Sequence, residues 1–159
     1  MFTRPALLTT LLCLFLTLCA VAPASAQCSG NNSDCQIILS GTALPASPSP
    51  PCTPWGLWVW SQPSNNNYGN DGHGAMYFYA ISKGEAIVEA SNVVLNGNYI
   101  SESVSGSFKP SGLPISCTLS AHQTSPGKGI LDSMSCTVGT TSCTASDIPI
   151  TVDISNAKK

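Results

Sequence analysis

Side chains able to act as a nucleophile or a general base are few in this sequence. The chain has two histidines, His73 and His122, among 159 residues. A Ser-His-Asp triad would require Asp71 or Asp132 to orient one of these histidines toward a serine. The G-x-S-x-G turn that presents a serine nucleophile does not occur in the sequence. We therefore expect no triad.

The eight acidic residues offer a second route to catalysis, because a glycosidase works with two carboxylates of separated pKa. The candidates are Glu85, Glu89, Glu102, Asp132, Asp147 and Asp153. Glu89 and Glu102 flank an Asn96-Gly97 hairpin signal on the polar phases of their strands. Acids spread in this way are typical of solvated surfaces, so we expect them to be exposed and predict that the protein is not an enzyme.

Aromatic residues supply the candidate binding surface. Trp58 and Trp60 share one face of a predicted strand whose other face is also apolar, and the same holds for Tyr77 and Tyr79 in the next strand. One hypothesis is that these rings pack in the core or under a covering segment. The other is an exposed platform on which sugar rings stack. The candidate ligand-binding residues are Trp58, Trp60, Tyr68, Tyr77 and Tyr79.

The segment Pro63 to Gly74 is rich in Asn, Asp and Gly and is long for a hairpin loop. Its oxygens could surround a calcium ion, which takes six to eight oxygen ligands. It contains a single carboxylate, Asp71, and no glutamate for a bidentate contact. A solvated turn region explains the same composition. We predict neither a metal nor a cofactor.

Six cysteines follow residue 26, and three disulfides account for them in an oxidising compartment. They are Cys28, Cys35, Cys52, Cys117, Cys136 and Cys143. No C-x-x-C pair occurs, which argues against a zinc site. A chain reversal near Ser125 to Gly129 would place Cys117 opposite Cys136 on apolar strand phases, so this bridge is favoured, although Cys143 could replace either partner.

The first 26 residues resemble an export signal. Arg4 precedes an apolar run, and Ala24-Ser25-Ala26 is typical of a cleavage site. The remaining 133 residues (159 − 26) carry five lysines and eight acids, for a formal charge of 5 − 8 = −3. We predict a secreted protein, extracellular or, in a Gram-negative bacterium, periplasmic, with no membrane span after cleavage. The absence of a basic patch argues against nucleic acid as a partner.

Residues 27–54 are predicted to be an N-terminal segment and a Pro-rich arm, and residues 55–159 an antiparallel β domain. The arm has five prolines between Leu44 and Pro54, which excludes helix and central strand. Seven or eight alternating segments follow the pattern of strands. They are 55–62, 75–82, 86–95, 99–108, 115–121, 130–138 and 148–154, with an apolar run at 36–42. We predict an all-β, two-sheet antiparallel sandwich stapled by disulfides, with a small β-barrel as the alternative.

These features together favour a secreted, non-catalytic binding module whose ligand is a carbohydrate or a cell-envelope polymer. A first alternative is a protease inhibitor or a module for an extracellular protein partner, acting through the Pro-rich arm. A second is a structural surface protein without a discrete ligand.

Overall fold

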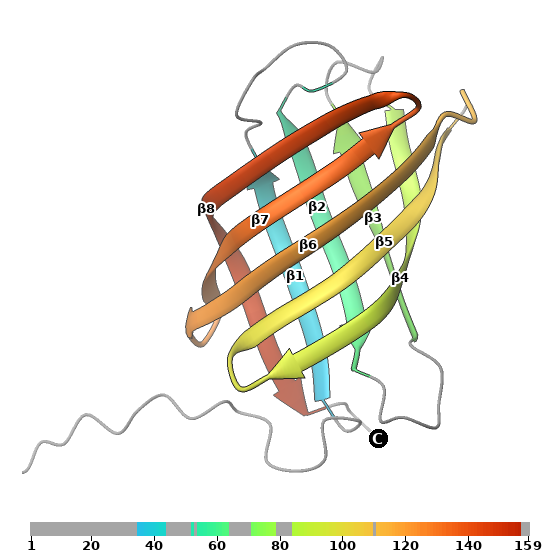
Figure 1. The fold of residues 1–159 in the computed structure, drawn as a ribbon. Coiled ribbons are helices and arrows are strands. Elements are labelled where there is room, and N and C mark those ends of the chain that lie inside the picture. Colours follow the sequence, from blue (N-terminus) through green and yellow to red (C-terminus); the bar gives the residue numbers. More distant parts are fainter. Residues whose placement is uncertain are drawn as a thin grey trace, which may run out of the picture.

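In the part of the chain that the computed structural model describes, eight β-strands, each antiparallel to its neighbours, form a closed barrel (Figure 1). The structure describes residues 35–43, 52, 54–63, 71–78, 84–109 and 111–156. The strands are β1 (Cys35–Ala43), β2 (Trp55–Gln62), β3 (Asp71–Phe78), β4 (Gly84–Asn96), β5 (Tyr99–Lys109), β6 (Pro114–Ser125), β7 (Lys128–Val138) and β8 (Thr141–Asn156). No helix in these residues is long and apolar enough to cross a membrane.

The two-sheet sandwich predicted from the strand pattern is wrong. Each strand pairs with the next in sequence, and β1 also pairs with β8, so the sheet closes on itself. Closure leaves no strand edge exposed, whereas a sandwich has four. β1 lies within 27–54, the segment expected to precede the β domain, and it contributes to the barrel on both of its sides.

Two long strands provide the curvature that closure requires. The first part of β8, up to Ile150, pairs with β7, and the part from Thr151 onward pairs with β1. In Figure 1 this strand passes from the front wall of the barrel to the back wall. In β4, a bulge between Ser91 and Val94 shifts the register against β5. A bulge bends its strand and increases the local twist, which suits a barrel wall.

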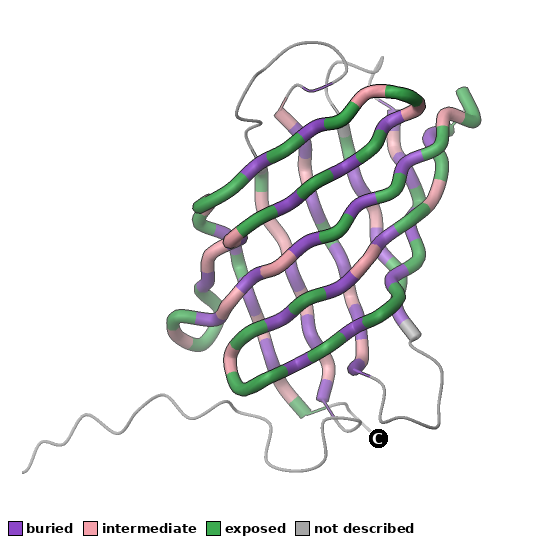
Figure 2. Tube along the Cα trace, in the orientation of Figure 1, coloured by how far each residue is buried: buried purple, intermediate pink, exposed green. Residues whose placement is uncertain are grey.

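Side chains fill the barrel. Burial alternates along every strand, with inward residues buried and outward residues exposed or half-buried (Figure 2). The largest fully buried side chains are Trp55, Phe108, Ile37, Leu39, Met76, Ile115, Leu131, Met134, Ile154, Val59 and Val88. Eight strands enclose a lumen that side chains can fill, and these residues form its core. An aromatic residue on the outer wall therefore does not belong to the core.

Most predicted strands are found close to their expected positions. The segments 55–62, 86–95, 99–108 and 130–138 match β2, β4, β5 and β7 to within two residues at each end. The strand expected at 75–82 is instead Asp71–Phe78, so the last residues of the predicted Pro63 to Gly74 loop are paired with β2. Two glycines in that stretch hide the strand pattern, because they lack the apolar side chains that mark an inward face.

The predicted hairpin between β4 and β5 is present, but its turn is one residue later than expected. Asn96 pairs with Tyr99, which leaves Gly97 and Asn98 as the turn. Gly97 has a φ of 62°, and Asn98 is not among the residues of positive φ. This fits a type II′ turn, whose first central residue is glycine.

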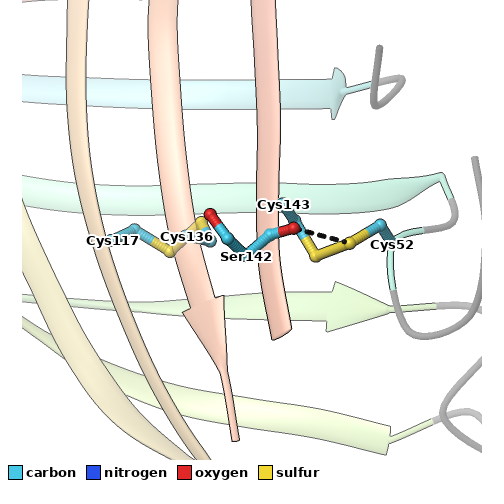
Figure 3. Close-up of a disulfide and its surroundings, with 5 residues drawn as sticks. All are labelled: Cys52, Cys117, Cys136, Ser142 and Cys143. Carbon is cyan, nitrogen blue, oxygen red and sulfur yellow. Dashed lines mark hydrogen bonds between the residues drawn. A yellow bond between two sulfur atoms is a disulfide. The ribbon is translucent and has the colours of Figure 1, made fainter. Parts of the chain in front are cut away.

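Two disulfides lie side by side at one end of the barrel (Figure 3). Cys117 of β6 is bonded to Cys136 of β7, directly opposite in the register, as the strand phases predicted. Cys143 of β8, the neighbour of Cys136, is bonded to Cys52. Cys35 is disulfide-bonded as well, and Cys28 lies outside the described residues. The bonds indicate an oxidising compartment.

Gly106 marks a place where two strand backbones approach too closely for any side chain. A Cβ added there would collide with the Ile87 carbonyl oxygen of the neighbouring strand. Gly106→Ala should therefore lower the free energy of unfolding by about 1–3 kcal/mol, measured by urea denaturation. Gly56→Ala is the control, because the nearest atoms to its added Cβ are 3.6 Å away. Equal midpoints for the two variants would contradict this account of β5 packing.

Candidate functional site

Three of the candidate ligand-binding residues, Trp58, Trp60 and Tyr77, lie on the outside of the barrel. Trp58 and Tyr77 each expose 43% of their surface, and Trp60 is half-buried. Leu57, Val59 and Met76, the alternate residues of the same strands, are buried in the lumen. Because the barrel is closed, the second apolar face of β2 and β3 has no second sheet to cover it.

His73 lies beside both tryptophans. Its ring centroid is 5.2 Å from that of Trp60 and 6.3 Å from that of Trp58, with tilted planes. His73 is directly opposite Trp60 in the register of β2 and β3, which explains the contact. We call Trp58, Trp60, His73 and Tyr77 the aromatic face. Strand phases alone could not include His73 in this face, because the residue was expected in a loop.

Hydrogen bonds hold two members of the aromatic face in place. The Trp60 indole N–H donates to Gln36 Oε1 at 3.4 Å, and Gln36 Nε2 donates to Ser155 Oγ at 3.0 Å. The Tyr77 hydroxyl donates to Glu85 Oε1 at 2.9 Å. That bond and the carboxylate charge raise the pKa of Tyr77, so the phenol stays protonated. Trp58 has no hydrogen-bond partner within the described residues, which leaves its indole N–H available.

Two of the predicted ligand-binding residues, Tyr68 and Tyr79, lie outside the described residues. The same is true of most of the Pro63 to Gly74 loop and of the Pro-rich arm, apart from Cys52 and Pro54. Where side chains are described, no group of three or more His, Cys, Asp or Glu is placed to hold a metal ion.

The expectation that Glu102 is exposed is wrong. Glu102 points into the lumen and retains only 3% exposure, whereas Glu89 is exposed as predicted. The inward phase of β5 runs through Ile100, Glu102, Val104 and Phe108, so the carboxyl occupies an apolar phase of its strand. This alternation is visible in the sequence and would have predicted a buried Glu102. The position of Glu102 near a hairpin suggested exposure instead.

Burial raises the pKa of Glu102 to about 7. The Ser61 hydroxyl, also buried, approaches the carboxyl and lowers the pKa by a smaller amount, but no well-formed hydrogen bond reaches Ser61 Oγ or either carboxyl oxygen. A buried acid with a near-neutral pKa is a common feature of catalytic sites. Here, however, the linings of two shallow hollows made by described residues include neither Glu102 nor Ser61. We therefore treat Glu102 as a determinant of stability.

His122 and Asp132 form the pair that a catalytic triad would need. His122 Nδ1 lies 2.7 Å from Asp132 Oδ1, and the Tyr99 ring is 5.3 Å from the imidazole. Among the described residues, no serine hydroxyl is bonded to His122. On the same two strands, the Ser120 and Ser133 hydroxyls are hydrogen-bonded to each other at 2.8 Å. The arrangement is a partly buried His–Asp contact between neighbouring strands, and among the described residues it has no nucleophile beside it.

The outer wall of β5 to β8 is covered by hydroxyl groups in register. The residues are Ser101, Ser103, Ser105, Ser116, Thr118, Ser120, Ser133, Ser135, Thr137, Ser142, Thr144 and Ser146. A shallow hollow of about 420 Å³ lies over β6 to β8, where these side chains are small. The wall holds neither an aromatic ring nor a charge at these positions, so it serves as a control surface for the aromatic face.

No family model matches the chain, and no curated protein or solved structure shows significant similarity to it. The function is therefore inferred from the chain's own geometry.

Proposed function

We propose that the protein is a secreted, non-catalytic binding domain whose aromatic face binds carbohydrate. The observation that carries this proposal is the exposure of Trp58 and Tyr77 on the outer wall, beside Trp60 and His73. Large aromatic side chains are normally buried, and an exposed group of them is typical of a binding surface. Ile87, on the neighbouring β4, extends the apolar area with 48% exposure.

Sugar rings suit such a surface because their C–H faces stack on aromatic rings while their hydroxyls need polar partners. Gln36, Glu85 and Glu89 border the aromatic face and provide these partners. Export follows from the residues of the predicted signal, and the disulfides are consistent with it.

Binding to polysaccharide should fall about tenfold in Trp58→Ala, since the loss of one stacking ring costs on the order of 1.4 kcal/mol. The measurement is depletion of the mature protein from solution by cellulose, chitin and bacterial cell-wall preparations. Because Trp58 is exposed, its replacement should leave the thermal midpoint nearly unchanged, which separates binding from folding.

Ser135→Ala, on the opposite wall, is the matched control and should bind like the native protein. If Trp58→Ala and Trp60→Ala both fold and bind like the native protein, the aromatic face is not the binding site.

A further inference from the structure

We propose that the aromatic face prefers polysaccharides carrying protonated amino groups, such as polymers of glucosamine. This inference rests on the carbohydrate binding proposed above and adds the charge of the ligand. Its basis is the placement of carboxylates around the aromatic rings.

One row of outward residues crosses five adjacent strands with a carboxylate at each end. The register pairs Asp153 with Ile38, Ile38 with Trp60, Trp60 with His73, and His73 with Glu89. Neighbouring strands are about 4.8 Å apart, so each carboxylate lies about 10 Å along the row from Trp60. A glycan that follows the curved wall across the strands would meet an acid on either side of the central ring.

Within the part of the chain that the structure describes, these acids have no cationic partner. Glu89 is exposed and Asp153 half-buried, and neither forms an ion pair or a side-chain hydrogen bond with a described residue. Glu85, the third acid at this surface, binds the Tyr77 hydroxyl. Lys109 lies opposite Glu85 at the border, and no ion pair joins them. Among its described residues, this surface thus combines three carboxylates with one lysine.

An ammonium group gains from both components of this surface. It is attracted to the face of an indole ring, with Trp the strongest partner among aromatic residues, and to an unpaired carboxylate. A neutral glycan can use the stacking alone, and a glycan bearing carboxylate or sulfate groups is repelled. The attraction between ammonium groups and carboxylates acts at an exposed surface and is therefore weakened by salt.

The test compares glucosamine hexamer with N-acetylglucosamine hexamer, by calorimetric titration of the mature protein at pH 6 and low salt. We expect the amino hexamer to bind at least tenfold more tightly, and we expect 0.5 M salt to remove most of the difference. Glu89→Gln combined with Asp153→Asn should abolish the preference. Asp147→Asn, which removes an exposed acid elsewhere on β8, should retain it.

His73 is the one base within the aromatic face, so His73→Gln should preserve or increase the preference for the amino hexamer. A preference that disappears in His73→Gln would overturn the charge argument. Equal affinity for the two hexamers, with Trp58→Ala still weakening both, would overturn the inference and leave carbohydrate binding intact. Failure to bind either hexamer or any polysaccharide would instead remove the proposed function itself.

Discussion

The native protein should lose stability as the pH rises from about 4.5 to about 7, and Glu102→Gln is expected to remove this loss. The pKa of Glu102 is raised from 4.5 to about 7 in the folded state. Within this window the unfolded chain has released the proton and the folded chain still holds it, so stability falls as pH rises. The total loss is about 3 kcal/mol, at 1.36 kcal/mol for each pKa unit. Below the window the acid is neutral in both states, so this pH-dependent loss is absent.

The measurement is urea denaturation of the native protein and the variant from pH 4 to pH 8. At pH 8 the variant should be the more stable protein by up to about 3 kcal/mol, and near pH 4 the two should be similar. Glu89→Gln is the matched control, because Glu89 is exposed on the outer wall, and it should keep the native pH dependence. If the free energy of unfolding depends on pH in the same way in Glu102→Gln and in the native protein, Glu102 is not the buried titrating group.

Removal of the Cys52–Cys143 bridge should cost more stability than removal of the Cys117–Cys136 bridge. The cysteines are 91 residues apart in the first case and 19 in the second. In the chain-entropy model the longer loop is worth about 5 kcal/mol and the shorter about 3 kcal/mol. Domains are stable by about 5–15 kcal/mol, so the loss of the first bridge removes a large share of the total.

The two double variants to compare are Cys52→Ala with Cys143→Ala, and Cys117→Ala with Cys136→Ala. All four cysteines are buried, so the side-chain volume lost is the same in both pairs and largely cancels in the comparison. Urea denaturation under oxidising conditions gives the two free energies of unfolding. A larger loss for the Cys117–Cys136 pair would mean that local packing between β6 and β7, rather than loop closure, determines the contribution of the bridges.

The site was predictable only in part, and the reason differs for each residue. The alternation around Trp58 and Trp60 placed them on one face of a strand, and the structure keeps them there. Whether that face met a second sheet or solvent depended on the closure of the barrel. The contact between these tryptophans and His73 depends on the register of β3, a strand whose glycines hide its pattern in the sequence. Glu102 was misplaced, although its phase in β5 was readable from Ile100 and Val104.

Side-chain alternation and turn residues within a few dozen positions were enough to predict the all-β class, most strand positions, the β4–β5 hairpin and the Cys117–Cys136 bridge. The same pattern could not distinguish a sandwich from a barrel. Both folds bury one face of every strand, so their alternation patterns are the same. The difference lies in the pairing of β1 with β8, between segments more than 100 residues apart, and in the bends of β4 and β8 that bring them together. That closure placed the aromatic face on the outside of the barrel and enclosed Glu102 within it.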